Sequence, residues 1–310
     1  MARILVTGVS GFVGKHLTRE LIKRGHEVIG VGLHDEPDPA IAGSLAAYLA
    51  CDLTDPAEVQ KIPLNGIDGV VSLAGLAQVG ASFKNSEEYK KINVAVLSVL
   101  GERIVEEKLP IKVLAVSSGA IYDSDQALPL TEESRLTGSG SPYAQSKILM
   151  EKRAEELRAS GLDCLVVRPF NHIGPGQEKG FLVPDLFEKI SRSLQNGEPV
   201  LVGDLKTRRD YTDVRDVVRA YAELITGSAA RHDVYNVASG HSVAGQRILD
   251  LLLEAMGARG RVEIEVNQTI IRPDDPKELF GSYDRLHEDI GWQPEIDLQR
   301  TIGDFVESAA

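Results

Sequence analysis

The 310-residue sequence contains only two cysteines, Cys51 and Cys164. Two thiols are too few for a disulfide framework or a zinc site, and a reducing cytoplasm is the compartment that accommodates them most easily. We therefore expect a cytoplasmic protein with no metal centre, in which both cysteines are small buried hydrophobic residues.

Long apolar runs are missing as well, since none approaches the length that crosses a bilayer. The apolar start of the chain, MARILVTGVSGF, runs into a glycine cluster without an export cleavage site, so we interpret it as a first strand. Positive charge is scarce too: 46 acidic residues against 34 basic ones give a net charge of -12. This balance argues against a general nucleic-acid or membrane-binding surface, and a phosphate-bearing ligand must be held by local positive groups.

What the sequence does contain is an alternation of β-branched runs and helix-length amphipathic segments. Strands that are apolar nearly throughout, with helices between them, predict a parallel sheet buried on both faces, which is the doubly wound α/β (Rossmann) fold. The predicted strands are RILVTG, EVIGVG, AAYLACDL, GVVSLAG, KVLAVSS and DCLVVRPF, with helices near 12–24, 86–107 and 143–159.

The periodicity loosens after Pro169, in NHIGPGQEKGF, over a length typical of a working loop. We predict a dinucleotide-binding domain at 1–168 and a smaller α/β domain, mainly substrate-binding, at 169–310. Because DVYNVASG at 233–240 resembles one more buried strand, a segment near 211–240 is expected to rejoin the first domain.

The turn TGVSGFVG follows the first strand and opens a helix, placing Gly8, Gly11 and Gly14 in a GxxGxxG spacing. Glycine allows backbone N–H groups to approach a pyrophosphate closely, and a helix N-terminus adds partial positive charge. This strand–turn–helix context predicts a dinucleotide site.

The end of the second strand commonly distinguishes NAD from NADP, because a carboxylate there binds the ribose hydroxyls and repels a 2'-phosphate. Gly32 occupies that position, which favours NADP(H) over NAD(H), although no arginine follows to grip the phosphate. Asp52 after the third strand either faces the adenine or caps the next helix. The predicted cofactor site comprises Gly8, Gly11, Phe12, Val13, Gly14, Gly32, His34, Asp52, Leu53, Leu73, Ala74, Gly75, Asn93, Tyr143 and Lys147.

The segment SPYAQSK sets Tyr143 and Lys147 four places apart, on one face of a helix. An ammonium roughly 4 Å from a phenol, at an effective dielectric constant of about 20, lowers its pKa by nearly three units. We therefore expect Tyr143 to act as a proton donor and acceptor near neutral pH. Ser118, at the end of the fifth strand, is placed to hydrogen-bond an oxygen that gains charge, and Asn93 either positions the lysine through water or closes a polar gap.

In this order, TGVSGFVG, SSGAIY, YAQSK and Asn93 resemble the extended short-chain dehydrogenase/reductase family that acts on nucleotide-linked sugars. The resemblance continues to the C-terminus through RPFNHIGPGQ, RRDYTDVRD, VYNVASG and GWQPEIDL. It implies that Tyr143 is the general acid/base, that Lys147 binds the nicotinamide ribose, and that Ser118 assists. It also implies that Asn171, Arg209 and Arg272 contact the substrate diphosphate, and that helices 86–107 and 143–159 pair two subunits in a homodimer.

The reaction type is narrowed by the residues after Ser118. Family members that are 4,6-dehydratases carry acids there, whereas this chain has Gly119 and Ala120, which disfavours dehydration. The motifs most resemble members that reduce a GDP-linked 4-keto-6-deoxy sugar with a reduced nicotinamide. Two alternatives are a nucleotide-sugar 4-epimerase with tightly bound NAD and a non-catalytic dinucleotide sensor. Asp123, where relatives commonly have glycine, departs from the family pattern.

Overall fold

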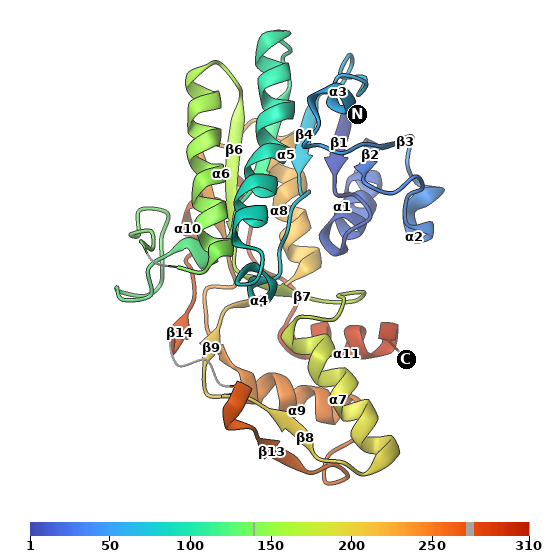
Figure 1. Ribbon diagram of the computed structural model, residues 1–310, viewed down its shortest axis with the longest axis vertical. Helices are drawn as coiled ribbons and strands as arrows, with labels where there is room; N and C mark the ends of the chain where they lie inside the picture. The colour runs from blue at the N-terminus through green and yellow to red at the C-terminus, as the bar shows by residue number, and fades with distance from the viewer. Residues whose placement is uncertain (139, 271–275, 310) are drawn as a thin grey trace.

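A seven-stranded parallel sheet forms the centre of the larger part of the protein (Figure 1). The computed structural model describes residues 1–138, 140–270 and 276–309. The strand order is β11-β6-β5-β4-β1-β2-β3, so the chain starts in the middle of the sheet and winds outward in both directions. The strands are β1 (Arg3–Thr7), β2 (Glu27–Gly32), β3 (Ala47–Ala50), β4 (Gly69–Ser72), β5 (Lys112–Val116), β6 (Cys164–Pro169) and β11 (Val234–Val237).

Helices cover both faces of this sheet, which confirms the doubly wound parallel fold. Helices α1 (Phe12–Lys23) and α8 (Val214–Thr226) pack together on one face, and α5 (Ser86–Glu106) and α6 (Pro142–Ala159) on the other. Central strands β4 and β6 are buried at every position, since apolar side chains point to both faces. The edge strand β3 is shorter than the predicted AAYLACDL and partly exposed, because it has a neighbour on one side only.

The chain leaves the sheet after β6 and returns to it through α8 and β11. Strand β11 pairs in parallel with β6, with Val234 opposite Val166. The predicted segment 233–240 therefore lies at the edge of the large sheet, while the division of the chain at residue 168 stays a prediction.

The smaller part lies below the carboxyl ends of the large sheet in Figure 1. Its longer helices, α7 (Leu182–Asn196), α9 (Gly245–Ala255) and α11 (Leu298–Ala309), share a core that includes Ile190, Leu249 and Phe305. Its strands pair as β10–β7, β12–β9–β14 and β13–β8. They are β7 (Asn171–Ile173), β8 (Val200–Val202), β9 (Arg208–Arg209), β10 (Tyr211–Asp213), β12 (Val243–Ala244), β13 (Ile264–Val266) and β14 (Glu278–Leu279).

Short helices complete the described structure. They are α2 (Pro39–Ala42), α3 (Pro56–Val59), α4 (Val79–Ser82), α10 (Asp284–Ile290) and the 3-10 turns Gly119–Ile121 and Gln268–Ile270.

In the part of the chain that the structure describes, no helix combines the length and apolar character needed to cross a membrane. Cys51 and Cys164 are both free and buried.

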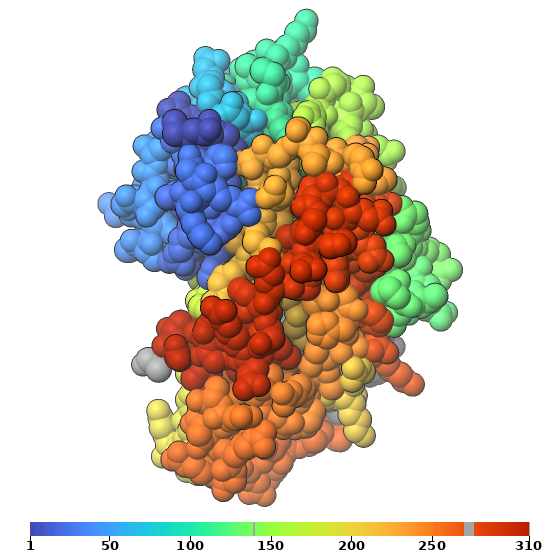
Figure 2. Space-filling view, turned by 180° about the vertical axis from the view of Figure 1, so that it is seen from behind, coloured from blue at the N-terminus to red at the C-terminus, as the bar shows by residue number. Residues whose placement is uncertain are grey.

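The C-terminal segment joins the two parts. Seen from behind in Figure 2, the red segment that contains α10 and α11 lies against both the upper and the lower part of the molecule. The Trp292 indole donates to the carbonyl of Asp216 on α8 at 3.0 Å, and the Asp216 carboxylate accepts from the amides of Glu295 and Ile296, both at 2.9 Å. These contacts fasten GWQPEIDL to the helix that covers the large sheet.

Candidate active site

The glycine turn between β1 and α1 is packed too closely for any other residue type. Gly8 has a φ of +64°, and a Cβ built on Gly14 would lie 2.5 Å from the carbonyl oxygens of Gly8 and Val9. No side chain caps α1, so the amides of its first turn at Phe12 and Val13 point out of the helix end without a side-chain acceptor. These features suit the pyrophosphate of a dinucleotide, which needs close backbone approach and unpaired N–H groups.

The end of β4 lies against the same turn. The Thr7 hydroxyl accepts from the amides of Leu73 and Ala74, both at 3.1 Å, and a Cβ on Gly8 would lie 3.0 Å from the Ala74 nitrogen. Gly75 follows with a φ of +148°. The structure therefore places residues 73–75 beside the glycine turn, as a joint cofactor site requires.

The loop after β2 meets a cation that comes from α1. Gly32 has no side chain there, and the Tyr48 hydroxyl fills the space next to it while donating to the carbonyl of His34 at 2.7 Å. The loop that follows returns Asp38 to the turn, where it pairs with Lys15 of α1 at 2.9 Å. Lys15 precedes Asp38 by 23 residues, so the sequence that follows Gly32 gives no sign of this cation.

Asp52 is held in a local turn. Its carboxylate accepts from the amide and hydroxyl of Thr54 at 2.9 and 2.7 Å, and these bonds lower its pKa. The N-terminal cap of the next helix, α3, is Asp55 instead, which accepts from the Ala57 amide. Leu53 is buried in the core beneath. Of the two roles considered for Asp52, capping of α3 is therefore wrong.

Tyr143 and Ser118 meet where α6 begins and β5 ends. Ser141 caps α6 through the Ala144 amide at 3.2 Å, and Pro142 starts the helix, so the phenol sits in the first turn. Ser118 accepts from the Ala120 amide at 3.2 Å, and its hydroxyl hydrogen-bonds the side chain of Tyr143. The Tyr143 phenol and the Ser118 hydroxyl are therefore in direct contact.

The charge state of the pair differs from the one predicted. Burial raises the pKa of Tyr143, and only the hydrogen bond from Ser118 opposes this effect. The Lys147 ammonium does not offset the burial, because it donates to the carbonyl of Val116 at 2.8 Å. Burial also lowers the pKa of Lys147 to about 8. In this structure the expected lowering of the Tyr143 pKa by Lys147 is therefore wrong, and the phenol is neutral near pH 7.

Asn93 supports the first turns of α6 through Ser146. Its amide nitrogen donates to the carbonyl of Leu76 at 3.1 Å and to the Ser146 hydroxyl at 2.8 Å, while its oxygen accepts from the Leu76 amide. Ser146 in turn donates to the carbonyl of Tyr143 at 2.7 Å. Both donor positions of Asn93 are thus occupied by protein groups, and they hold the turn that carries Tyr143.

Two of the three residues expected to bind a diphosphate lie in short strands of the smaller part, β7 and β9. Asn171, at the exposed start of β7, is in register with Tyr211 of β10, two residues after Arg209. Arg209 is partly exposed in β9 and donates to the carbonyl of Arg208 at 2.8 Å. Arg272 lies outside the described residues.

His172 packs against the start of α1 and was not singled out from the sequence. Its ring stacks on Phe12 of the glycine turn, with centroids 6.2 Å apart and planes at 9°. Burial lowers the pKa of His172, so the ring is neutral. Its place directly after Asn171 in RPFNH was the available signal.

A model of the NAD dependent epimerase/dehydratase family matches residues 4–238. The chain belongs to this family. It is therefore an NAD(P)-dependent enzyme of the extended short-chain dehydrogenase/reductase type. The match spans the large sheet as far as the end of β11.

Relatives of the chain include a reductase and several epimerases. The chain is 32% identical to a GDP-6-deoxy-D-mannose reductase of Pseudomonas aeruginosa, over 97% of this chain and 94% of that protein. The structure of RMD from Pseudomonas aeruginosa complexed with NADPH is similar with a TM-score of 0.83 and 30% identity, covering 99% and 98% of the two chains. A UDP-glucose 4-epimerase from Thermotoga maritima, solved with UDP-glucose, has a TM-score of 0.87 and 28% identity, over 99% and 98%.

Within this epimerase/dehydratase framework, the position after Ser118 is sterically closed. A Cβ on Gly119 would lie 2.9 Å from the ring of Phe170, so a carboxylic acid there would displace that ring. Ala120 is exposed but carries no titratable group.

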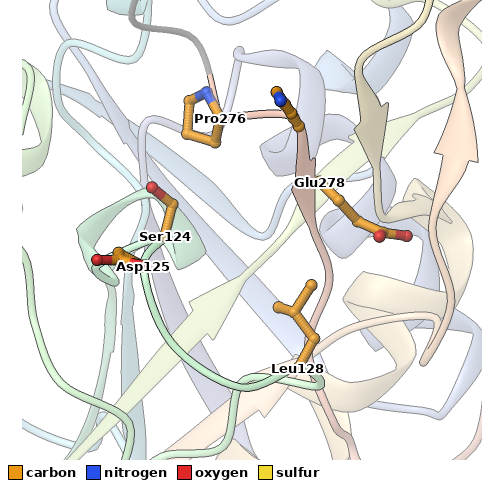
Figure 3. Close-up of a pocket in the computed structure, with 6 residues that line it drawn as sticks. Ser124, Asp125, Leu128, Pro276 and Glu278 are labelled. Atoms are coloured by element: carbon orange, nitrogen blue, oxygen red, sulfur yellow. The ribbon is translucent and has the colours of Figure 1, made fainter.

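A surface hollow of about 370 Å³ lies between the loop after Tyr122 and strand β14 (Figure 3). In Figure 3, Ser124, Asp125 and Leu128 come from the loop and face Pro276 and Glu278 across the opening. Asp123, the departure from the family pattern, begins this loop and pairs with Arg135 at 3.0 Å. The atypical loop therefore forms one wall of an opening, of which neither Tyr143 nor Ser118 is a part.

Proposed function

We propose that this protein reduces the ketone of a nucleotide-linked 4-keto-6-deoxy sugar, of the GDP-4-keto-6-deoxy-mannose type, to the 4-hydroxy sugar. The cofactor supplies a hydride to the carbonyl carbon when it is bound. Tyr143 gives its phenolic proton to the carbonyl oxygen, Ser118 hydrogen-bonds that oxygen, and Lys147 holds the ribose. One ketone, one reduced nicotinamide and one proton yield one alcohol and one oxidised nicotinamide.

The observations that carry the proposal are the buried Tyr143 phenol hydrogen-bonded to Ser118 and the 32% identity to a reductase. Reduction needs a proton donor at this position, whereas the oxidation that starts an epimerisation needs a base. Burial keeps the phenol neutral while Lys147 is bound to the carbonyl of Val116. Gly119 and Ala120 offer no acid for dehydration, and the 32% identical relative is a reductase.

NADP(H) is the cofactor that the end of β2 favours. Gly32 presents no carboxylate to a 2'-phosphate, and Lys15 supplies a cation close to the glycine turn. Asp38, whose amide binds the Ser10 hydroxyl of the turn at 3.0 Å, is already paired with Lys15. A 2'-phosphate could compete for that ammonium.

We further propose that a second copy of the chain binds the face formed by α5 and α6. A groove of about 670 Å³ lies along it, with Val94, Ala95, Val99 and Leu149 at its apolar centre. Charged residues of both signs surround this centre, including Lys152 and Glu156, so two copies related by a two-fold axis are able to offer opposite charges to each other. With two buried free thiols, such a homodimer suits the reducing cytoplasm.

The decisive experiment supplies purified protein with GDP-, UDP- and dTDP-linked 4-keto-6-deoxy sugars and with NADPH or NADH. We expect loss of the reduced-nicotinamide absorbance and formation of the 4-hydroxy sugar, faster with NADPH. The epimerase alternative is favoured by the TM-score of 0.87 to an epimerase. It predicts no consumption of reduced cofactor, NAD that copurifies, and interconversion of 4-hydroxy sugar epimers.

A further inference from the structure

Glu151 lies one helical turn after Lys147 on α6. Opposite charges at positions i and i+4 of a helix normally attract each other into an ion pair. Among the described residues Lys147 has no ion-pair partner, and its ammonium binds the carbonyl of Val116 at 2.8 Å instead. A competing contact must therefore hold the Glu151 carboxylate away.

That contact is Arg168 of β6. Its Nε and Nη2 donate to the two oxygens of Glu151 at 2.9 and 2.7 Å, which is the two-pronged geometry that makes arginine–carboxylate pairs strong. The side chains of Arg168 and Glu151 are only 7% and 11% exposed, so water does not screen the pair. Both carboxylate oxygens are thereby turned toward β6.

Arg168 is itself fixed from the other side. Its Nη1 donates to the Tyr122 hydroxyl at 2.9 Å and to the carbonyl of Glu132 at 3.0 Å, and its guanidinium lies 5.1 Å from the centre of the Tyr122 ring. The Tyr122 hydroxyl donates onward to Asn236 of β11 at 2.7 Å. A guanidinium with this many partners has little freedom to release Glu151.

We propose that Arg168 is a positioning residue for Lys147: by holding Glu151, it keeps the carboxylate from capturing the ammonium and leaves the ammonium available to the cofactor. The inference rests on the proposed role of Lys147 at the nicotinamide ribose. It does not depend on which sugar reaction follows.

The electrostatics of the helix agree with this geometry. The carboxylate of Glu151 is the charged group that raises the pKa of Lys147, against the larger effect of burial. Burial raises the pKa of Tyr143 on the same helix, so the phenol adds no negative charge. Arg168 on β6 forms an ion pair with Glu151, which offsets the charge of that carboxylate. A Glu151 released from Arg168 would act on Lys147 at full strength.

The test is a pair of variants studied by titration with NADPH, and with NADH, without any sugar. R168M frees Glu151, and we expect cofactor affinity at pH 7 to fall by about tenfold or more as Lys147 is drawn into an ion pair. The cofactor affinity of R168M should also stay constant to a higher pH than that of the wild type, because the released Glu151 raises the pKa of Lys147 further. The double variant R168M/E151Q removes the competing carboxylate, so affinity should return to within about threefold of the wild type.

The matched control is R103M, which removes another buried arginine, one that binds the carbonyls of Val59 and Ile62 at 2.6 and 2.8 Å, far along α5. It should lower thermal stability and leave cofactor affinity unchanged. Wild-type affinity in R168M, or a double variant as weak as R168M, would overturn the proposal.

If R168M fails to fold, R168K serves in its place, because it keeps the cation but loses the two-pronged grip. A smaller loss of affinity, again repaired by E151Q, is expected, whereas full affinity with an unshifted pH profile would overturn the inference. Because no sugar is present, these results are independent of the reductase assignment. A protein that reduces no keto sugar but shows the R168M loss and its repair contradicts only the proposed function.

Discussion

At the scale of single residues, the proposed chemistry depends on three side chains that come from different elements. Ser118 comes from the end of β5, and Tyr143 and Lys147 come from α6. Their identities and their spacing are readable in the sequence, but their charge states are not. Burial, which only the packed structure creates, decides both pKa directions.

Replacing Tyr143 with phenylalanine removes the proposed proton donor. We expect turnover to fall by about 10²- to 10⁴-fold while cofactor affinity is retained, as measured by steady-state kinetics and by fluorescence titration. Y221F is the matched control, since the Tyr221 hydroxyl is fully buried and has no hydrogen-bond partner among the residues that the structure describes. Unchanged turnover in Y143F would remove the phenol from its assigned role.

Cofactor affinity should depend on pH through Lys147. The pKa of Lys147 is about 8 in this structure, and a bound diphosphate favours the ammonium, so the pKa in the complex must be higher. Affinity is therefore greatest below pH 8 and declines above it by up to about tenfold per pH unit, until the pKa of the complex is reached. Titrations from pH 6 to pH 10 measure this slope. In K147M the affinity should be weaker and flat over this range, and an identical slope there would assign the titration to another group.

Cofactor choice should respond to residue 32. G32D introduces a carboxylate at the end of β2, and the ratio of NADPH to NADH affinity should fall by about tenfold. Because a Cβ at this position would lie 2.6 Å from the Tyr48 hydroxyl, G32A is needed to measure the steric effect alone. An equal change in the ratio for G32A and G32D would show that packing, and not charge, is responsible.

At the scale of elements, the strand–turn–helix unit β1–α1 is the part that the sequence predicted most completely. The apolar strand, the spacing of the glycines and the start of the helix can each be recognised from a few neighbouring residues. The return of Asp38 to this turn was not, because it requires the loop after β2 to fold back over α1. Local signals fix an element, whereas contacts between elements depend on how the elements pack.

G14A tests the packing of this unit. Its Cβ would meet two backbone oxygens at 2.5 Å, so α1 must shift, and we expect a loss of about 1–3 kcal/mol in the free energy of unfolding together with weaker cofactor binding. G303A is the control: a Cβ on Gly303 in α11 would meet no atom of the other described residues within 4 Å beyond its own helix. Alanine there should stabilise the protein by about 0.5–1 kcal/mol. Urea unfolding gives both values. A G14A protein as stable as the wild type would contradict the tight turn.

At the scale of the whole molecule, the chain passes between the larger and the smaller part more than once. After β6 the chain enters the smaller part, comes back through α8 and β11, and then leaves again. Asn171 and Arg209 lie in β7 and β9, short strands that follow the first of these crossings. The alternation of strands and helices in the sequence could not predict where these strands lie, because their position depends on the order of strands in the sheets.

The α5–α6 face should hold two subunits together. Leu149 is 40% exposed on it, and L149K places a further cation beside Lys90, Lys91 and Lys152. We expect the wild type to sediment as a dimer and L149K as a monomer at micromolar concentration. L201K, at a leucine 41% exposed on β8 in the smaller part, should remain dimeric. A wild-type monomer, or a dimeric L149K, would place the subunit interface elsewhere.

The sequence by itself determined the doubly wound sheet, the glycine turn and the Tyr143–Lys147 spacing, because period, turn chemistry and helical geometry act over a few residues. Tertiary structure alone decided that burial raises the pKa of Tyr143, that Lys15 pairs with Asp38 of the loop after β2, and that Arg168 pairs with Glu151. Each of these depends on burial or on contacts between residues far apart in the chain, and both arise only when the elements have packed.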